Sequence, residues 1–181
     1  MDAVVRSGQQ EELIAAAPTD TIFALATGAP PSAIAIIRVS GPAAWQAAAE
    51  IAGPNPPARM ASYRRFHDPV SGETLDRGLL LLFPEGHSVT GEACAEFQVH
   101  GSRAVVDAML RALGTIPHCR LARAGEFTWR AFKHGRMDLP MVEGLGDLLS
   151  AETESQRRAA ARIAEGGLSA KVAGWRTELL A

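Results

Sequence analysis

Arg38 is the residue of this sequence that most clearly needs a charged partner, because it is the one charged residue in the apolar run of residues 33–39. The run is rich in Ile and Val and predicts a buried β-strand. A guanidinium keeps its charge at physiological pH, so burying it without a partner is very costly. We therefore expect Arg38 either to form an internal ion pair or to contact an anionic ligand.

Glu96 is the second candidate, since apolar and polar side chains alternate through residues 93–99. In a strand, this alternation places Glu96 on the same face as Cys94 and Gln98. That face is either an ordinary solvated surface or a place where Glu96 accepts hydrogen bonds from a ligand. A carboxylate can accept two parallel hydrogen bonds, for example from an amino-pyrimidinone edge.

Residues 120–136 form a locally basic stretch. Glu126, its single acid, lies four residues before Arg130, the spacing of an ion pair on one helix face. The stretch is either a solvated polar surface or the source of cations for an anionic ligand. Its cations are Arg120, Arg123, Arg130, Lys133 and Arg136.

Several catalytic motifs are missing from the sequence. It has no phosphate-binding loop of the form G-x-x-x-x-G-K-[ST], no dinucleotide fingerprint, no H-E-x-x-H and no serine nucleophile elbow. The five histidines lack metal-ligand spacing, and two cysteines are too few for a disulfide framework. We predict a binding site without catalytic or metal-ligating residues, in a protein of the reducing cytoplasm.

Short apolar runs separated by Gly and Pro predict the strands that position these residues. They lie near residues 21–26, 33–39, 62–66, 78–83, 93–99 and 119–122, with helices at residues 43–52 and 102–114. This order predicts an α+β fold in which a mixed β-sheet is flanked by helices. The 181 residues suffice for one domain with an appendage, and no apolar run is long enough to span a membrane.

Asp138, followed by Pro140, has the pattern of a helix start, and apolar spacing beyond it predicts two helices with a break at Gly166 and Gly167. Their apolar stripes have little in this chain to pack against, so we expect a partner subunit or further sequence. Residues 1–19 are polar and then alanine-rich, and we expect an N-terminal extension, ordered or disordered, outside the core.

Five blocks, in the same order, resemble the N-terminal part of the MnmE family of tRNA-modification GTPases, also called TrmE. The blocks are residues 20–22 (DTI), 36–42 (IIRVSGP), 88–92 (SVTGE), 96–101 (EFQVHG) and 125–139 (GEFTWRAFKHGRMDL). The resemblance implies a tetrahydrofolate-binding and dimerisation domain at residues 20–136, similar to that of folate-dependent aminomethyltransferases. Residues 137–181 would begin an all-α domain that this chain does not complete.

The resemblance also implies a role in modifying C5 of the tRNA wobble uridine, together with an MnmG-like FAD protein. The expected cofactor is 5-formyl- or 5,10-methylene-tetrahydrofolate, bound by a homodimer. The family's GTPase domain and C-terminal cysteine motif do not occur in this sequence. The chain would therefore be a fragment or a gene product that stops early, with no catalysis expected from it alone.

The family's folate contacts fall on Arg38, Glu96 and Arg136. Arg136 replaces a lysine, which keeps the charge but changes the shape. The glycine-rich turn of the family is altered at residues 30–35, Val89 replaces an aromatic residue, and Ala93 replaces an aspartate. Two alternatives stay open: a structural dimerisation module with a vestigial folate pocket, and a stand-alone folate-dependent one-carbon transferase.

Overall fold

The computed structural model describes residues 20–180, which form two compact units. The first unit contains residues 20–88 and 92–123, and the second contains Val89–Gly91 and the chain from Ala124 onwards. The chain therefore crosses between the units three times, after residues 88, 91 and 123. The expected N-terminal extension, residues 1–19, lies outside the described residues.

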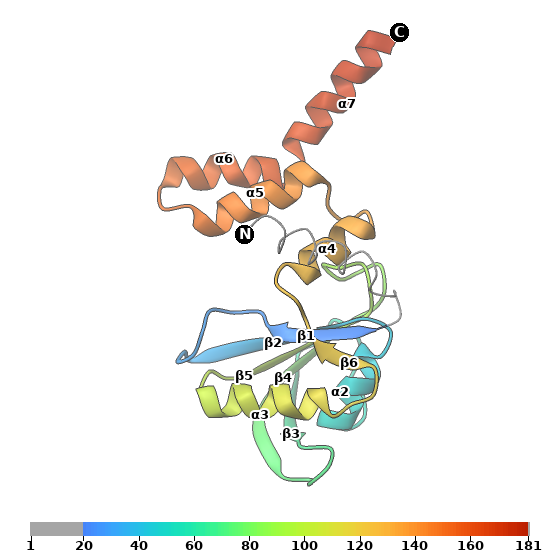
Figure 1. Cartoon of the computed structure of the whole chain (residues 1–181), viewed down its shortest axis with the longest axis vertical. Coiled ribbons are helices and arrows are strands. Elements are labelled where there is room, and N and C mark those ends of the chain that lie inside the picture. Colours follow the sequence, from blue (N-terminus) through green and yellow to red (C-terminus); the bar gives the residue numbers. More distant parts are fainter. Residues whose placement is uncertain (1–19, 181) are drawn as a thin grey trace, which may run out of the picture. The chain divides into compact units, whose positions relative to one another are not determined.

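The first unit is built on a six-stranded sheet with the order β3-β4-β5-β2-β1-β6 (Figure 1). In the described chain, β1 and β6 pair in parallel, and the other neighbouring strands pair antiparallel. The predicted α+β class with a mixed sheet is therefore confirmed. The elements are β1 (Thr21–Leu25), β2 (Ile34–Ser40), α2 (Ala44–Ala52), β3 (Ser62–His67), β4 (Thr74–Phe83), β5 (Cys94–His100), α3 (Arg103–Gly114) and β6 (Cys119–Leu121).

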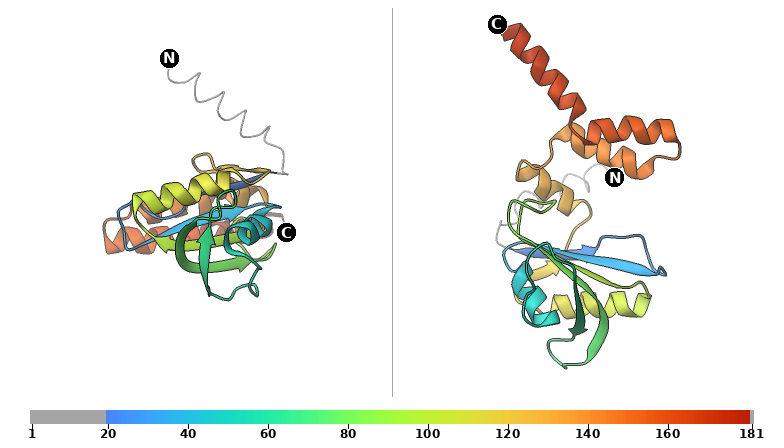
Figure 2. Two further views of the ribbon diagram at one scale, coloured as in Figure 1. Left: turned by 90° about the horizontal axis from the view of Figure 1, so that it is seen from below. Right: turned by 180° about the vertical axis from the view of Figure 1, so that it is seen from behind.

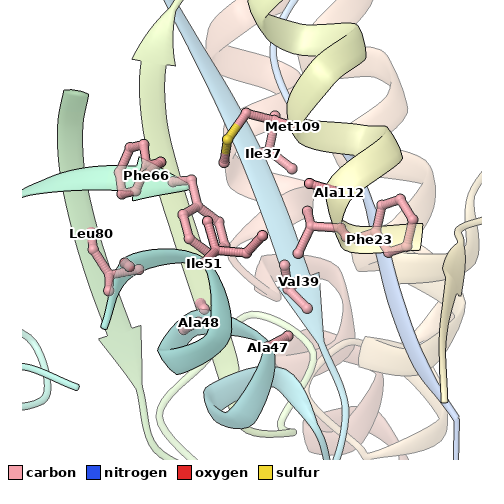
Figure 3. Close-up of a cluster of buried hydrophobic side chains, with 14 of the residues drawn as sticks. Phe23, Ile37, Val39, Ala47, Ala48, Ile51, Phe66, Leu80, Met109 and Ala112 are labelled. Carbon is pink, nitrogen blue, oxygen red and sulfur yellow. The ribbon is translucent and has the colours of Figure 1, made fainter. Parts of the chain in front are cut away.

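Helices α2 and α3 cover one face of the sheet, and the hydrophobic core lies between them and the strands (Figure 2). Ile37 and Val39 of β2 point into this core, where Ile51 of α2 and Met109 of α3 meet them (Figure 3). Strand residues alternate between the two faces, so the residue between Ile37 and Val39 points the other way. That residue is Arg38.

Side-chain hydrogen bonds define the start of α3 and attach α2 to the sheet. The Ser102 hydroxyl accepts a hydrogen bond from the backbone N–H of Val105 at 3.2 Å and begins α3 as an N-cap. The indole N–H of Trp45 in α2 donates to the carbonyl oxygens of Phe83 and Cys94, at 3.2 Å each. Helix α2 is thereby held against the end of β4 and the start of β5.

The second unit contains α4 (Glu126–Lys133), α5 (Leu139–Ser150), α6 (Glu154–Ala164) and α7 (Gly167–Leu180). Helices α5 and α6 lie side by side (Figure 1). The predicted start at Asp138 is confirmed, because its carboxylate accepts from the backbone N–H of Met141 at 2.9 Å. None of the helices in residues 20–180 has both the length and the apolar character needed to span a bilayer.

The prediction of two helices after Asp138 is wrong, because the described chain forms three. The break at Gly166 is present, with a φ of 83°, but another break follows Ser150. Thr153 begins α6 with a reciprocal capping box: its hydroxyl accepts from the Gln156 N–H, and the Gln156 side chain accepts from the Thr153 N–H. These hydrogen bonds stabilise a new helix start where apolar spacing alone suggested continuation.

Candidate functional site

Arg38 and Glu96 lie directly opposite each other on the adjacent strands β2 and β5. The Arg38 Nε donates to the Glu96 Oε1 at 2.9 Å, and the two side chains are 25% and 16% exposed. The arginine expected to need a partner therefore has an internal one. Two of the three predicted site residues are brought together in the middle of the sheet.

The ion pair occupies a row of otherwise apolar residues. Ala24 lies beside Arg38 on β1, and Leu81 lies beside Glu96 on β4. The two helices that the structure describes in this unit both pack on the other face, so neither covers this row. The two side chains are nevertheless only partly exposed, so the pair interacts more strongly than a fully exposed pair would.

Glu96 keeps hydrogen-bonding capacity beyond its contact with Arg38. A carboxylate has two oxygens that can accept bonds, and the Arg38 contact uses Oε1. Among residues 20–180, Oε2 has no hydrogen-bonding partner. The pair therefore offers an oriented, partly buried acceptor, which suits a ligand with a donor edge.

The turn before β5 is anchored by side chains that sequence reasoning did not single out. The Ser40 hydroxyl donates to the Glu92 carboxylate at 2.6 Å, and the Ser88 hydroxyl donates to the Glu92 carbonyl oxygen at 2.6 Å. The Gly41 N–H donates to the Ala93 carbonyl oxygen at 3.0 Å. These contacts fix the start of β5 against the end of β2, and so support the register that pairs Arg38 with Glu96.

Arg136, the third predicted site residue, belongs to the second unit and is exposed. It follows α4 in a segment that packs on the turn Val89–Gly91, where a Cβ at Gly91 would lie 3.2 Å from the Arg136 Cγ. His134 of the same segment donates from Nδ1 to the Thr90 carbonyl oxygen at 2.9 Å. Arg136 and the Arg38–Glu96 pair belong to different units, so the folate contact of Arg136 stays a prediction.

Three of the basic residues in the 120–136 stretch have internal partners. Arg120 is ion-paired with Asp20, and Arg130 contacts Glu126 at 3.2 Å across one helical turn, as their spacing predicted. The Lys133 ammonium lies 5.0 Å from the centre of the Trp129 ring, in a cation–π contact. The ion pairs and the cation–π contact give these three cations a structural role that requires no ligand.

The thiol of Cys119 is poorly suited to act as a nucleophile at neutral pH. Burial, with a smaller contribution from Glu50, raises the pKa of the Cys119 thiol to about 11. The thiol therefore stays protonated at neutral pH, when only a thiolate would be a good nucleophile. In the described part of the chain, no three His, Cys, Asp or Glu side chains are grouped so that they could hold a metal ion.

Comparison of the sequence with known proteins places this chain in a family. A family model described as "GTP-binding protein TrmE N-terminus" matches residues 21–136. The tRNA modification GTPase MnmE of Novosphingobium aromaticivorans is 53% identical over 162 residues, covering 90% of this chain and 37% of the relative. That of Sinorhizobium medicae is 53% identical over 161 residues, covering 89% and 36%. The chain thus spans little more than a third of the length of these relatives.

Proposed function

Because this chain belongs to the family of the TrmE N-terminus, we propose that it is the folate-binding and homodimerising portion of an MnmE-like protein. The relatives are named tRNA modification GTPases, and we extend to this chain a part in that process. Its place would be in modification of C5 of the wobble uridine, in the cytoplasm. The MnmG-like FAD protein and tRNA would be partners of the full-length protein.

The Arg38–Glu96 pair is the observation that carries the proposal. A tetrahydrofolate derivative, 5-formyl- or 5,10-methylene-tetrahydrofolate, has an amino-pyrimidinone edge that donates hydrogen bonds and a tail that carries carboxylates. Glu96, 16% exposed and with Oε2 free among the described residues, is suited to accept the ring edge. Arg38 holds that carboxylate in place and, with Arg136, would meet the polar or anionic remainder. The bound folate would supply the one-carbon unit.

Isothermal titration with 5-formyltetrahydrofolate tests the proposal. A hydrogen bond to a charged group contributes about 1.5–3 kcal/mol, so Glu96→Gln should weaken binding roughly 10- to 100-fold. Glu85→Gln is the matched control, because Glu85 is exposed in the loop after β4 and should leave the affinity unchanged. Absence of heat with the wild-type chain, or equal affinity in Glu96→Gln, refutes the assignment.

The oligomeric state separates this proposal from the structural alternative. Light scattering should show a dimer both with and without the folate, and the calorimetric titration should show that this dimer binds the ligand. A dimer whose calorimetric titration shows no folate binding would instead favour a dimerisation module with a vestigial pocket. A one-carbon transfer assay with this chain alone is expected to show no turnover, and turnover would favour the stand-alone transferase.

A further inference from the structure

Two arginines face each other at one end of the sheet surface that carries Arg38 and Glu96. Arg65 of β3 and Arg77 of β4 are directly opposite in the antiparallel register, and both are exposed. Like charges in this arrangement repel and destabilise a strand pair. Within residues 20–180, neither arginine forms an ion pair. The repulsion is therefore uncompensated by any acid of the described chain.

A cavity of about 290 Å³ lies beside Arg77 on the first unit. Apolar side chains of Ile34 and Leu79 line it, together with the polar side chains of Tyr63, Gln98 and His100. Tyr63 is 70% exposed and lies directly opposite Leu79 in the strand register, so its ring is available to a ligand. This lining suits a group that is part aromatic or apolar and part anionic.

Asp76 is the acid nearest in sequence to Arg77, and its hydrogen bonds go to His100. The His100 backbone N–H donates to its Oδ2 at 2.8 Å, and the His100 Nδ1 lies 2.8 Å from its Oδ1. Burial opposes ionisation of Asp76, but these hydrogen bonds outweigh burial and hold its pKa below the ordinary value. Asp76 thus fixes His100 at the rim of the cavity and does not line the cavity itself.

The cavity and the Arg38–Glu96 pair lie along the same strand, because Gln98 and His100 of the cavity lining and Glu96 of the pair all belong to β5. Glu96, Gln98 and His100 occupy alternate positions of β5 and so project from the same face. Glu96 and His100 are four residue steps apart along the strand, a distance of about 13 Å. A ligand bound at Glu96 and extended along β5 passes Gln98 and reaches Tyr63, Arg77 and His100.

We infer that this cavity binds the carboxylate-bearing end of the ligand whose ring edge is held by Glu96. The inference rests on the proposed function, under which this end is the glutamate tail of a folate and the ring beside Tyr63 is its aminobenzoyl group. Arg77, supported by Arg65, holds the tail carboxylates, which leaves Arg38 and Arg136 to contact polar groups at the ring end of the ligand. Because each added glutamate brings another carboxylate to two adjacent cations, the site favours polyglutamylated folates.

A small ligand fits these observations better than a nucleic acid does. The two arginines adjoin a cavity with an apolar lining, whereas a phosphate backbone is bound by an extended basic surface. The net charge of the whole chain is −2, which gives no general attraction for RNA.

Titration with three ligands that differ only in the tail tests the inference. The ligands are the triglutamate and monoglutamate of 5-formyltetrahydrofolate and the matching pteroic acid amide, which has neither a glutamate nor a free benzoyl carboxylate. For the wild-type chain, affinity should fall from triglutamate to monoglutamate to the amide. Arg77→Ala should weaken binding of both glutamate forms about tenfold and leave binding of the amide unchanged. Arg65→Ala should act in the same direction, and Arg103→Ala, an exposed arginine at the start of α3, should change nothing.

Stability gives an independent readout. Arg77→Ala removes one of two repelling charges, so its Tm should equal or exceed that of the wild type while its affinity for the glutamate forms falls. A lower Tm together with equal losses for all three ligands would indicate general damage and overturn the inference.

The outcomes for the tail and for the ring are distinguishable. If the wild-type chain binds all three ligands equally and Glu96→Gln weakens them all, the tail site is refuted and folate binding stands. If none of the three binds, both proposals fail. If Arg77→Ala weakens tRNA binding but no folate, the arginines serve a nucleic acid and the inference is overturned.

Discussion

Removing the Arg38 charge should destabilise the first unit by about 2 kcal/mol. Exposed ion pairs contribute about 0–1 kcal/mol, whereas loss of one partner from a fully buried pair costs about 3–5 kcal/mol. The Arg38–Glu96 pair lies between these limits, with 25% and 16% exposure and a 2.9 Å contact. Arg38→Met keeps much of the apolar stem and leaves the Glu96 carboxylate without its cation, so an intermediate cost is expected.

Urea denaturation of a double-mutant cycle measures this interaction. Arg38→Met alone should cost about 2 kcal/mol, equivalent to a fall in Tm of roughly 4–8 °C for a chain of this size. Adding Glu96→Gln should recover part of that loss, because the unpaired carboxylate is then gone. Trp45 fluorescence, in a background where Trp129 and Trp175 are phenylalanine, reports on the first unit, since only Trp45 of the three belongs to it.

The double-mutant cycle can also refute the predicted interaction between Arg38 and Glu96. Residues without interaction give additive effects within about 0.3–0.5 kcal/mol. Additive losses for Arg38→Met and Glu96→Gln would show that the ion pair contributes nothing to the fold. The backbone pairing of β2 with β5 alone would then explain why the two side chains lie opposite each other.

Two further predictions concern packing and a thiol. Gly144→Ala should destabilise the second unit by about 1–3 kcal/mol, because the new Cβ would lie 2.6 Å from the backbone N of Ala164 and force α5 from α6. Gly146→Ala in the same helix meets nothing within 4 Å and should stabilise by up to about 1 kcal/mol; equal effects in thermal unfolding would contradict the packing. Cys119, with its pKa raised to about 11, should react slowly with iodoacetamide at pH 8 and faster as the pH rises, and at an ordinary rate once unfolded. Fast labelling of the native chain at pH 8, located by peptide mass spectrometry, would contradict this environment.

Much of the fold could be predicted from local sequence because most strands contain a short apolar run bounded by turn residues. The alternation in residues 93–99 also predicted the correct face for Glu96, since Ala95, Phe97 and Val99 are buried. The partner of Arg38 could not be found this way. Strands β2 and β5 are neighbours in the sheet but are separated in sequence by α2, β3 and β4, so their register depends on tertiary packing.

The misses have two different physical origins. The break before α6 had a visible signal, Thr153 followed three residues later by Gln156, but apolar spacing was given more weight than capping. The placement of Arg65 opposite Arg77 had no local signal, because it follows only from the cross-strand register. Strand β4, which carries Arg77, begins at Thr74, whereas the apolar run predicted a start near residue 78. The polar residues at the start of β4 hid this part of the strand.

The three crossings of the chain between the two units have an evolutionary consequence. A piece ending at Arg123 would keep the turn Val89–Gly91 but lose His134, which donates to Thr90, and a piece starting at Ala124 would have the reverse loss. Neither unit is encoded by one continuous segment. A single genetic crossover therefore cannot exchange one unit for a homologous copy without replacing one side of this contact. Substitutions in the turn Val89–Gly91 and in the segment after α4 are therefore expected to co-vary among homologous proteins.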